Sequence, residues 1–579
     1  MAMNPIVKAQ LGKFREANPN ETYSESDFFE VMSIFSIENG VLGENIDPFR
    51  AHLKGDEFGI DGIAISIQGA LCTDVDEAAD ILSVGKNHTS EFRFYQSKTS
   101  DSLDYGNISK FLDAVYDFFT EKKFVTGAQL ENLVDVKDTI YEEATKTSPS
   151  LRCYYCTTGS GQVSDVIQKL IDTNKARLAD LNIFNEIHIE CIGAKIIQNG
   201  FRAATNSSSA KLNFPKAITM PTHEKVDEAY IGYVPATEIL EIALGDPDQG
   251  GSRHINRSLF YDNVRDFNPN SEINKTILSE LESGDNSSFV FKNNGITVIS
   301  KSIDRKGDTF SIEDYQIVNG CQTTNILAHI KDNVEGISVP LRLIGCSDID
   351  FVSSVIVGTN RQNEVKEEQF WAMRPFMKDL EEYCASQGGD GRIFIERRDN
   401  QYRDISIERT RIFKPSDLMK AAAAMFFHQP HRAARDHRGI RNEFADRIFA
   451  EGHNVELYYV AALALYKFDF LVRTAKIDRS RAIFKFYALY SLFREHWKSP
   501  NILDASPKSQ KKVKDAVVSI LNDSERFLTK FESVAIHLEK IIAEAGVTSR
   551  EKIRDYIRTE SVVVEFSNRL FPQEEEQLS

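Results

Sequence analysis

The sequence predicts three parts of different fold class: an α/β part over residues 1–205, an α+β part over 206–415 and an all-α part over 416–579. In the first part, strands with alternating apolar residues interleave with amphipathic helices. The second part has short strands between turn dipeptides, and the third has helical periodicity nearly to its end. Strands that alternate with helices indicate helices packed around a mostly parallel or mixed sheet.

Seven segments of the first part show a clear pattern. The helices are predicted over 27–37, 108–120 and 162–181, and the strands over 59–67, 91–97, 151–157 and 186–192. The first helix is expected to be capped by Ser26 or Asp27, because their side chains accept hydrogen bonds from free backbone N–H groups. The polar stretch over 203–210 (AATNSSSA) is typical of a linker to the next domain.

The second part contains short apolar runs. Its strands are predicted over 289–291, 295–299, 315–318 and 340–344. Asn-Gly pairs at 294–295 and 319–320 favour turns with positive φ, and a helix is expected to begin after the second pair. In the third part, Ser416 is the predicted cap of an alanine-rich helix, and amphipathic periods continue to Phe571.

Composition limits the class of protein. The 579 residues include 69 Lys and Arg against 86 Asp and Glu, a formal net charge of −17. This excludes a globally cationic protein that coats nucleic acid or an anionic membrane, but it permits a local basic groove. The odd number of cysteines, seven, is typical of a reducing compartment. Because neither a secretory signal nor a run of about 18 apolar residues is visible, we expect a cytoplasmic protein with no membrane contact.

The sharpest chemical signal is EFGIDGIAI over 57–65, followed by FYQSK over 94–98. Gln96 and Lys98 are two residues apart on one predicted strand, so both leave the same face, where Asp61 of the adjoining strand can meet them. Phosphodiester hydrolysis needs a divalent cation at the scissile phosphate, an attacking water and a positive charge. An acid, an amide oxygen and an ammonium group could supply those parts.

These residues resemble the "GxD … QxK" motif of the Mrr-like branch of the PD-(D/E)XK nucleases, in which glutamine replaces the acidic residue of the (D/E)XK element. The resemblance implies a restriction-endonuclease-like fold for residues 1–205, with Mg²⁺ or Mn²⁺ as cofactor. It makes Asp61 the principal metal ligand and Gln96 an orienting ligand through its amide oxygen. Lys98 would position or activate the attacking water.

Relatives often add an acidic residue from the preceding helix. Glu30 is the first candidate for this catalytic and metal-binding role and Glu38 the second, while Glu57 stands where relatives frequently carry an aspartate. Two features depart from the family pattern. A neutral amide is a weaker ligand for a hard cation than a carboxylate, and the stretch over 73–80 is longer than usual.

Cys153 and Cys156 form a CxxC pattern that could indicate a metal or redox site. However, LRCYYCT alternates like a buried strand, which would place the two sulfurs on opposite faces. We therefore expect both cysteines to be structural.

Five phrases of the second part together resemble the AIPR family, named for abortive-infection phage resistance. They are NVRD at 263–266, FKNNGIT at 291–297, QIVNGCQTT at 316–324, TNRQNEV at 359–365 and IERRDNQY at 395–402. Relatives commonly carry an Mrr-like segment in front, whereas Cys321 stands where many have glutamine. The resemblance implies a role in antiphage defence.

The polar residues of these phrases could line a pocket for a base edge or a phosphate. The candidate ligand-binding residues are Asn293, Asn294, Asn319, Gln322, Thr323, Asn360, Gln362, Arg397 and Arg398. The alternative is an internal hydrogen-bond network that holds irregular loops together. We favour that network for the asparagines and phosphate contact for the arginines.

Positive charge is concentrated between residues 391 and 500, which hold 21 Lys and Arg against 13 Asp and Glu. Four arginines recur there every three residues and would share adjoining turns of one helix. They are Arg432, Arg435, Arg438 and Arg441. The face could contact phosphates, with Arg432 and Arg435 as nucleic-acid-binding candidates, or it could be solvated and paired with acidic neighbours.

Two functions of different class follow from these patterns. The first is a metal-dependent endonuclease in bacterial antiphage defence by abortive infection, with DNA favoured over RNA as its substrate. The second is a non-catalytic protein that senses nucleic acid or a nucleotide on a degenerate nuclease fold. Both give nucleic acid as the partner, and both are compatible with a homodimer and a phage-derived trigger.

Overall fold

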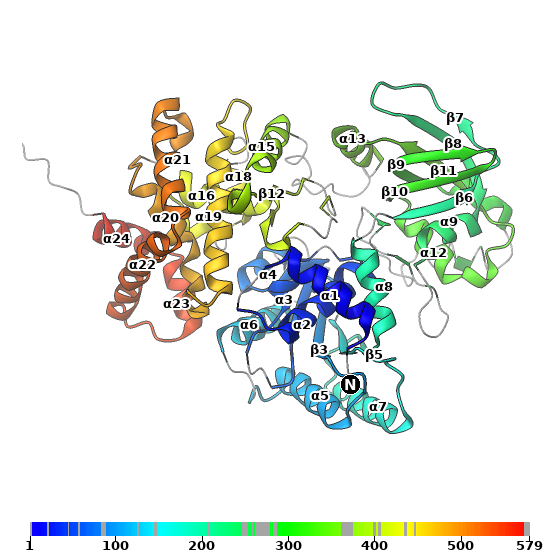
Figure 1. Cartoon of the computed structure of the whole chain (residues 1–579), viewed down its shortest axis with the longest axis horizontal. Coiled ribbons are helices and arrows are strands. Elements are labelled where there is room, and N and C mark those ends of the chain that lie inside the picture. Colours follow the sequence, from blue (N-terminus) through cyan, green and yellow to red (C-terminus); the bar gives the residue numbers. More distant parts are fainter. Residues whose placement is uncertain are drawn as a thin grey trace, which may run out of the picture.

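The computed structural model shows three parts, with the central sheet and the C-terminal helices on opposite sides above the N-terminal part in Figure 1. The structure describes residues 3–19, 22–44, 46–55, 58–82, 88–123, 127–143, 148–205, 208–245, 253, 255–256, 259–260, 278–279, 281, 286–359, 374–397, 401–402, 407–433, 437–444, 447–499 and 501–571. Among these residues, no helix combines the length and apolar character needed to cross a bilayer.

The N-terminal part is built on a five-stranded sheet of order β2–β1–β3–β4–β5. The strands are β1 (Gly62–Ile67), β2 (Ala70–Cys72), β3 (Ser90–Lys98), β4 (Ser150–Thr157) and β5 (Glu186–Ile192). β1 runs antiparallel to β2 and β3, whereas β3, β4 and β5 are parallel. The sheet is therefore mixed, and the α/β class expected for this part is confirmed at that level.

Helices cover both faces of this sheet. One face packs against α1 (Pro5–Ala17), α2 (Glu25–Phe35), the π-helix η1 (Ser36–Val41) and α8 (Ala194–Thr205). The other packs against α4 (Val75–Leu82), α5 (Tyr105–Phe119), α6 (Ala128–Glu143) and α7 (Asp165–Ala179). Cys156 lies in the first core and Cys153 in the second, and both are free thiols. The prediction that they occupy opposite strand faces is confirmed.

Several bounds of the N-terminal part differ from the prediction: β1 begins at Gly62 rather than at residue 59, α5 at Tyr105 rather than at 108, and α7 at Asp165 rather than at 162. α2 begins at Glu25 with Ser24 as its cap rather than Ser26 or Asp27, because Asp27 lies three residues on and completes a capping box with Ser24. The expected linker over 203–210 is mostly regular structure, since α8 continues to Thr205 and β6 begins at Ser209.

The central part is a six-stranded sheet of order β6–β10–β9–β11–β8–β7. Its strands are β6 (Ser209–Asn213), β7 (Ile218–Thr219), β8 (Glu228–Pro235), β9 (Ile296–Lys306), β10 (Thr309–Asn319) and β11 (Ser338–Gly345). β9 and β11 are parallel, and the other pairs are antiparallel. One face packs against α9 (Ala236–Ala243) and α12 (Cys321–His329), and the other against α13 (Ile349–Thr359).

The strand predicted over 289–291 is wrong, because these residues begin the short helix α11 (Phe289–Lys292). Phe289 is buried while Phe291 is 88% exposed, which is not the pattern of two residues on one strand face. The turns at the Asn-Gly pairs are confirmed. Gly295 has φ +83° and Gly320 has φ +103°, and α12 begins directly after Gly320.

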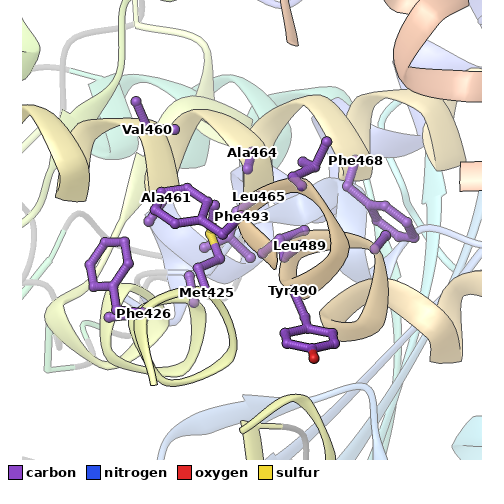
Figure 2. Close-up of a cluster of buried hydrophobic side chains, with 14 of the residues drawn as sticks. Met425, Phe426, Val460, Ala461, Ala464, Leu465, Phe468, Leu489, Tyr490 and Phe493 are labelled. Carbon is purple, nitrogen blue, oxygen red and sulfur yellow. The ribbon is translucent and has the colours of Figure 1, made fainter. Parts of the chain in front are cut away.

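The C-terminal part is helical. Its helices are α15 (Pro375–Ser386), α16 (Pro415–Phe426), α17 (Pro430–Ala433), α18 (His437–Phe444), α19 (Val455–Arg473), α20 (Lys485–Arg494), α21 (Pro507–Leu521), α22 (Ser524–Glu544), α23 (Arg550–Ile557) and α24 (Glu560–Leu570). Side chains of α16, α19 and α20 meet at its centre, among them Met425, Leu465 and Phe493 (Figure 2). The same core begins at Phe376, so α15 packs with these helices rather than with the central sheet.

The cap of α16 also differs from the prediction. The N-cap residue is Lys414, and its backbone N–H donates to Asp417 Oδ2 at 3.0 Å, whereas Ser416 lies inside the helix. Pro415 occupies the first helical position, where its fixed φ suits the helix and its missing N–H costs nothing. The proline therefore sets the start of this helix, rather than the serine that follows it.

The C-terminal helices contact the N-terminal part directly. Arg558, which directly follows α23, pairs with Asp76 of α4, and Arg554 Nη1 of α23 lies 3.3 Å from Asp135 Oδ2 of α6. The backbone N–H of Arg409 donates to Asn18 Oδ1 at 3.2 Å. The first two contacts fix the helical part against α4 and α6, which pack against β1.

Candidate functional site

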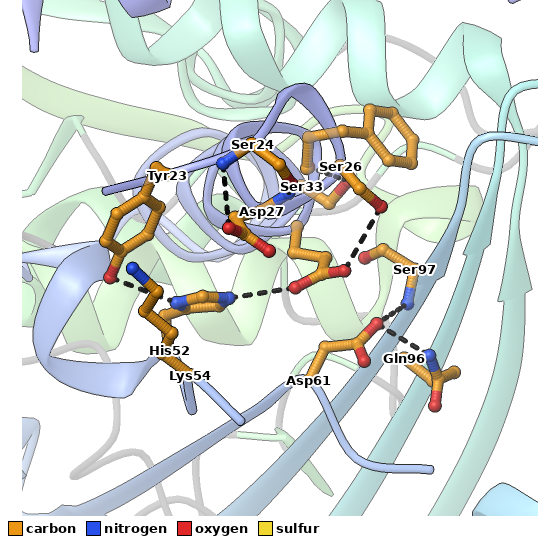
Figure 3. A network of polar contacts seen from close by, with 12 residues as sticks. Tyr23, Ser24, Ser26, Asp27, Ser33, His52, Lys54, Asp61, Gln96 and Ser97 are labelled. Carbon is orange, nitrogen blue, oxygen red and sulfur yellow. Dashed lines mark hydrogen bonds and ion pairs between the residues drawn. The ribbon is translucent and has the colours of Figure 1, made fainter. Parts of the chain in front are cut away.

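Asp61 lies at the point where the chain enters β1. Its backbone N–H donates to the Tyr95 carbonyl of β3 at 2.8 Å, so the residue is held by the same pairing that forms the sheet. Its Oδ2 accepts two hydrogen bonds of 2.6 Å, from Gln96 Nε2 and from the backbone N–H of Ser97 (Figure 3). The structure thus brings Asp61 and Gln96 into direct contact.

Glu30 reaches the same place from α2. Its Oε2 lies 2.9 Å from His52 Nε2, and its Oε1 accepts a long hydrogen bond of 3.4 Å from Ser26 Oγ. The other ring nitrogen of His52, Nδ1, lies 3.3 Å from the Tyr23 hydroxyl. Figure 3 shows His52 between Tyr23 on one side and the Asp61–Gln96 pair on the other.

Electrostatic effects connect these side chains with Lys98. The pKa of Asp61 is raised to about 6, first by burial and then by the charge of Glu30, while Lys98 and His52 lower it. Burial and the charge of Asp27 raise the pKa of Glu30 to about 7, and Lys98 opposes this rise as well. Two carboxylates that resist ionisation therefore lie within the field of one ammonium group.

The other two acidic candidates stand apart from this cluster. Glu38 lies on η1, is fully buried in the core on the opposite face of the sheet, and pairs with Arg93 Nε at 2.8 Å. The Tyr95 hydroxyl donates to the same carboxylate. Glu38 is therefore bound within a structural ion cluster. Glu57 lies outside the described residues.

The donor set suits a hard divalent cation. Among the described residues, no three His, Cys, Asp or Glu side chains are gathered closely enough to hold a metal by themselves. Mg²⁺, however, binds through one or two carboxylates completed by water and substrate phosphate. Asp61 and Glu30 could be those carboxylates, and mutual repulsion between them would be relieved by a cation.

Gln96 can join the two carboxylates as a cation ligand only through its amide oxygen. Its amide nitrogen faces Asp61, but rotation of the amide exchanges nitrogen and oxygen at that position. Neighbouring ligands of an octahedral Mg²⁺ with bonds of about 2.1 Å lie about 3 Å apart. The 2.6 Å separation between the Gln96 and Asp61 atoms is close to that spacing.

Sequence patterns did not reveal three further residues of this site. His52 and Tyr23 belong to no motif, and their roles depend on chain segments that meet only in the fold. Tyr155 of β4 lies directly beside Gln96 in the strand register, is 1% exposed, and its hydroxyl has no hydrogen-bond partner among the described residues. The alternation of the strand over 151–157 could have placed Tyr155 on the Gln96 face.

The polar residues of the central part form local bonds. Asn293 Nδ2 donates to Thr323 Oγ1 at 2.9 Å, and Asn293 Oδ1 accepts from the Gly295 N–H at 2.8 Å. Asn319 Nδ2 donates to the Thr359 carbonyl at 3.2 Å. These contacts are those of an internal network that supports the turns. Asn294 and Gln322 are exposed, and Asn360 and Gln362 lie outside the described residues.

The arginine candidates are paired with acids where the structure describes them. Arg397 is buried and pairs with Asp350 Oδ1 at 2.5 Å and with Glu381 Oε2 at 3.3 Å, a geometry that favours a structural role over phosphate contact. Arg432 Nη1 lies 2.6 Å from Glu443 Oε2. The structure describes helix at Pro430–Ala433 (α17) and at His437–Phe444 (α18), and residues 434–436 between them lie outside the described residues, so the single arginine helix stays a prediction. Arg398 and Arg435 lie outside the described residues.

Comparison with known proteins gives one family. The family model described as AIPR protein matches residues 260–568, which is more than half of the chain and covers most of the central and helical parts. No curated protein and no solved structure matches the chain significantly. The N-terminal part, which carries the cluster around Asp61, lies outside the matched residues.

Proposed function

The chain belongs to the AIPR family, and from this premise we propose that it is a metal-dependent nuclease of bacterial antiphage defence by abortive infection. The family match supports the defence role. The nuclease assignment rests on one observation: Asp61, at the start of β1, contacts Gln96 of the central strand β3, within the field of Glu30 and Lys98. DNA is the expected substrate, with RNA second.

The proposed reaction is hydrolysis, in which water attacks phosphorus in line and the sugar oxygen departs. A bound Mg²⁺ or Mn²⁺ would polarise the phosphate and lower the pKa of the attacking water. Asp61 and Glu30 would hold the cation, and Gln96 would join them as a ligand through its amide oxygen after rotation of the amide. Lys98 would supply positive charge where negative charge develops on the phosphate oxygens, which is the kind of fixed charge that stabilises such a transition state.

Nucleic acid is the partner of the N-terminal part in this proposal, and a phage-derived signal is the trigger. The central and helical parts would then recognise the signal or restrain the enzyme until it arrives. A homodimer is a further expectation, which light scattering after size-exclusion chromatography would test.

The test uses the full-length protein with plasmid, single-stranded DNA and RNA, each with Mg²⁺, with Mn²⁺ and with a chelator. We expect cleavage only with a divalent cation, and loss of at least 100-fold in rate in Asp61→Ala and Lys98→Ala, since removal of one stabilising charge costs roughly 10²–10³ in rate. Lys175→Ala, an exposed lysine of α7, is the matched control and should cleave like the wild type. Equal cleavage by all four proteins would refute the assignment.

A second function is favoured by the amide nitrogen that Gln96 turns toward Asp61 and by the lack of a third carboxylate or histidine ligand among the described residues. In this alternative the cluster binds nucleic acid or a nucleotide without cutting. It predicts salt-sensitive binding of oligonucleotides that is unchanged by chelator, together with no products after long incubation with Mn²⁺.

A further inference from the structure

We propose that His52 is a positioning residue of this site: its imidazole holds the Glu30 carboxylate beside Asp61 and thereby sets the affinity of the pair for a divalent cation. The inference rests on the proposed function, because the orientation of Glu30 has this consequence only if a cation binds between the two acids. It assigns a role to a side chain that no motif of the sequence identifies.

The first support is the contact itself. His52 Nε2 lies 2.9 Å from Glu30 Oε2, and the His52 side chain has no exposed surface, so solvent does not compete for this bond. Glu30 keeps 16% of its side-chain surface exposed. One carboxylate oxygen is therefore held from the protein side, whereas its long 3.4 Å bond to Ser26 leaves the other weakly held.

Tyr23 gives the imidazole one consistent hydrogen-bond arrangement. If the Tyr23 hydroxyl donates to Nδ1, at 3.3 Å, the neutral ring carries its proton on Nε2 and donates it to Glu30. Tyr23 also contacts the imidazole ring, with centroids 5.4 Å apart. Tyrosine, histidine and glutamate thus form a chain in which each donor has an acceptor, the arrangement that typically orients metal-ligating carboxylates from outside.

The backbone at His52 holds the main chain of the residue that carries the other carboxylate, Asp61. His52 forms an antiparallel bridge with Gly62, and the N–H of the next residue, Leu53, donates to the Asp61 carbonyl at 2.9 Å. Gln129 Nε2 donates to the His52 carbonyl at 2.9 Å and ties this segment to α6. His52 therefore connects Glu30, through its side chain, to the start of β1, through its main chain.

The test is a titration of the full-length protein with Mn²⁺ in the absence of nucleic acid. Electron paramagnetic resonance measures the free Mn²⁺ at each step of the titration. Loss of an outer partner of a metal ligand typically weakens affinity by roughly 10–100-fold, so we expect that loss in His52→Ala. His52→Gln can still donate an amide N–H to Glu30 and should remain within about threefold of the wild type. Tyr23→Phe, which removes only the hydroxyl, should weaken binding by less than His52→Ala.

His88 provides the matched control. It is a buried histidine of the same part, 7% exposed, whose Nε2 lies 3.0 Å from the Leu82 carbonyl. His88→Ala should lose comparable packing yet bind Mn²⁺ like the wild type, and circular dichroism establishes that each variant is folded. If His88→Ala weakens binding as much as His52→Ala, or if His52→Gln fails to restore it, the effect is one of packing and the inference is overturned.

Asp61→Ala separates this inference from the proposed function. If Asp61→Ala weakens Mn²⁺ binding while His52→Ala binds like the wild type, the cation site stands and the role of His52 is refuted. If Asp61→Ala binds Mn²⁺ like the wild type, or the wild type binds none, the cation does not lie at this cluster. In that case both the proposed function and the inference fail.

Discussion

At the scale of single residues, the cluster around Asp61 costs the protein stability. Burial and the charge of Glu30 raise the pKa of Asp61 to about 6, and burial and the charge of Asp27 raise that of Glu30 to about 7, so both carboxylates are less stable as anions here than in an unfolded chain. Groups of this kind gather at functional sites, where charge is needed for chemistry rather than for folding. The adjacent ammonium group of Lys98 offsets only part of the cost.

The first prediction concerns the stability of Asp61→Asn. A raised pKa means that the folded state holds the proton more tightly, so the free energy of unfolding falls as pH rises from about 4 to about 6. Asparagine keeps an oxygen to accept from Ser97 and carries no charge. We expect Asp61→Asn to be more stable at pH 8 by roughly 1–3 kcal/mol, and this gain should shrink toward pH 5.

Thermal melts of both proteins at pH 5 and pH 8 measure this difference. Asp104→Asn is the control, because Asp104 caps α5 through the Asn107 N–H at 2.8 Å and asparagine caps helices equally well. It should melt like the wild type at both pH values. A lower melting temperature for Asp61→Asn at pH 8 would show that the ionised carboxylate stabilises the fold instead.

The second prediction concerns the pH dependence of cation binding. Metal ligands must be deprotonated, and the two acids have pKa values of about 6 and about 7. Mn²⁺ affinity should therefore rise steeply between pH 5.5 and pH 7.5, by up to about tenfold per unit for each ligand that loses a proton, and level off near pH 8. Mn²⁺ titrations at five pH values measure this increase in affinity. In Glu30→Gln the increase should occur at lower pH. An affinity that is flat over this range would contradict the assignment.

The site residues that could be predicted from the sequence are those whose contacts follow from strand pairing and from positions close together in the chain. Gln96 and Lys98 share a strand face because they are two residues apart, and Asp61 contacts Gln96 and lies within the field of Lys98 because β1 pairs with β3. His52 could not be found in this way, since its contact with Glu30 spans 22 residues and arises from the packing of α2 beside β1. The partners of Arg397, Asp350 and Glu381, are similarly distant in the sequence.

At the scale of elements, the buried strands were the most predictable. β5 has the predicted bounds, and β3 and β4 extend at most one residue beyond theirs at either end, because their alternation continues through a core on both faces. The three apolar residues at 289–291 fit a strand or a helix equally well, so periodicity alone gave the wrong element. The π-helix η1 directly follows α2, and the composition of the sequence does not change where the π-helix begins. η1 packs against α8, a contact that the local sequence does not reveal.

The third prediction tests that contact. A Cβ at Gly200 of α8 would lie 2.3 Å from the Ser36 carbonyl oxygen of η1, so an alanine must push the two helices apart. Gly200→Ala should destabilise the N-terminal part by about 1–3 kcal/mol, the usual cost of overpacking. Urea denaturation followed by circular dichroism measures the loss.

Gly12 of α1 is the matched glycine, because a Cβ there has no described atom within 4 Å. Gly12→Ala should stabilise α1 by about 0.5–1 kcal/mol, since alanine has a higher helix propensity than glycine. If both substitutions change stability in the same direction, the close approach of α8 and η1 is not what requires Gly200.

At the scale of the whole molecule, the helical part reaches the Tyr23–His52–Glu30 chain. Burial raises the pKa of Tyr23 to about 12. The charges of Arg473, at the end of α19, and of Arg479, beyond that helix, oppose this rise. On the other side, Arg558 and Arg554 contact α4 and α6, which pack against β1. The C-terminal helices thus brace the elements that hold Asp61, which couples the family-matched residues to the candidate site.

The fourth prediction tests this brace. Arg558 and Asp76 are each only 8% exposed, so removing the arginine leaves a buried carboxylate without its partner. Breaking a buried ion pair in this way costs about 3–5 kcal/mol. Arg558→Ala should therefore loosen α4, and hydrogen exchange followed by mass spectrometry should show faster exchange in residues 75–82 and in the adjoining β1. Arg569→Ala removes a partly exposed arginine from the more exposed Glu544 and Glu565, where the loss of stability should be much smaller and exchange in α4 should stay unchanged. Unchanged exchange in α4 of Arg558→Ala would mean that the N-terminal part holds its site without help from the C-terminal helices, and that any restraint on the enzyme acts elsewhere.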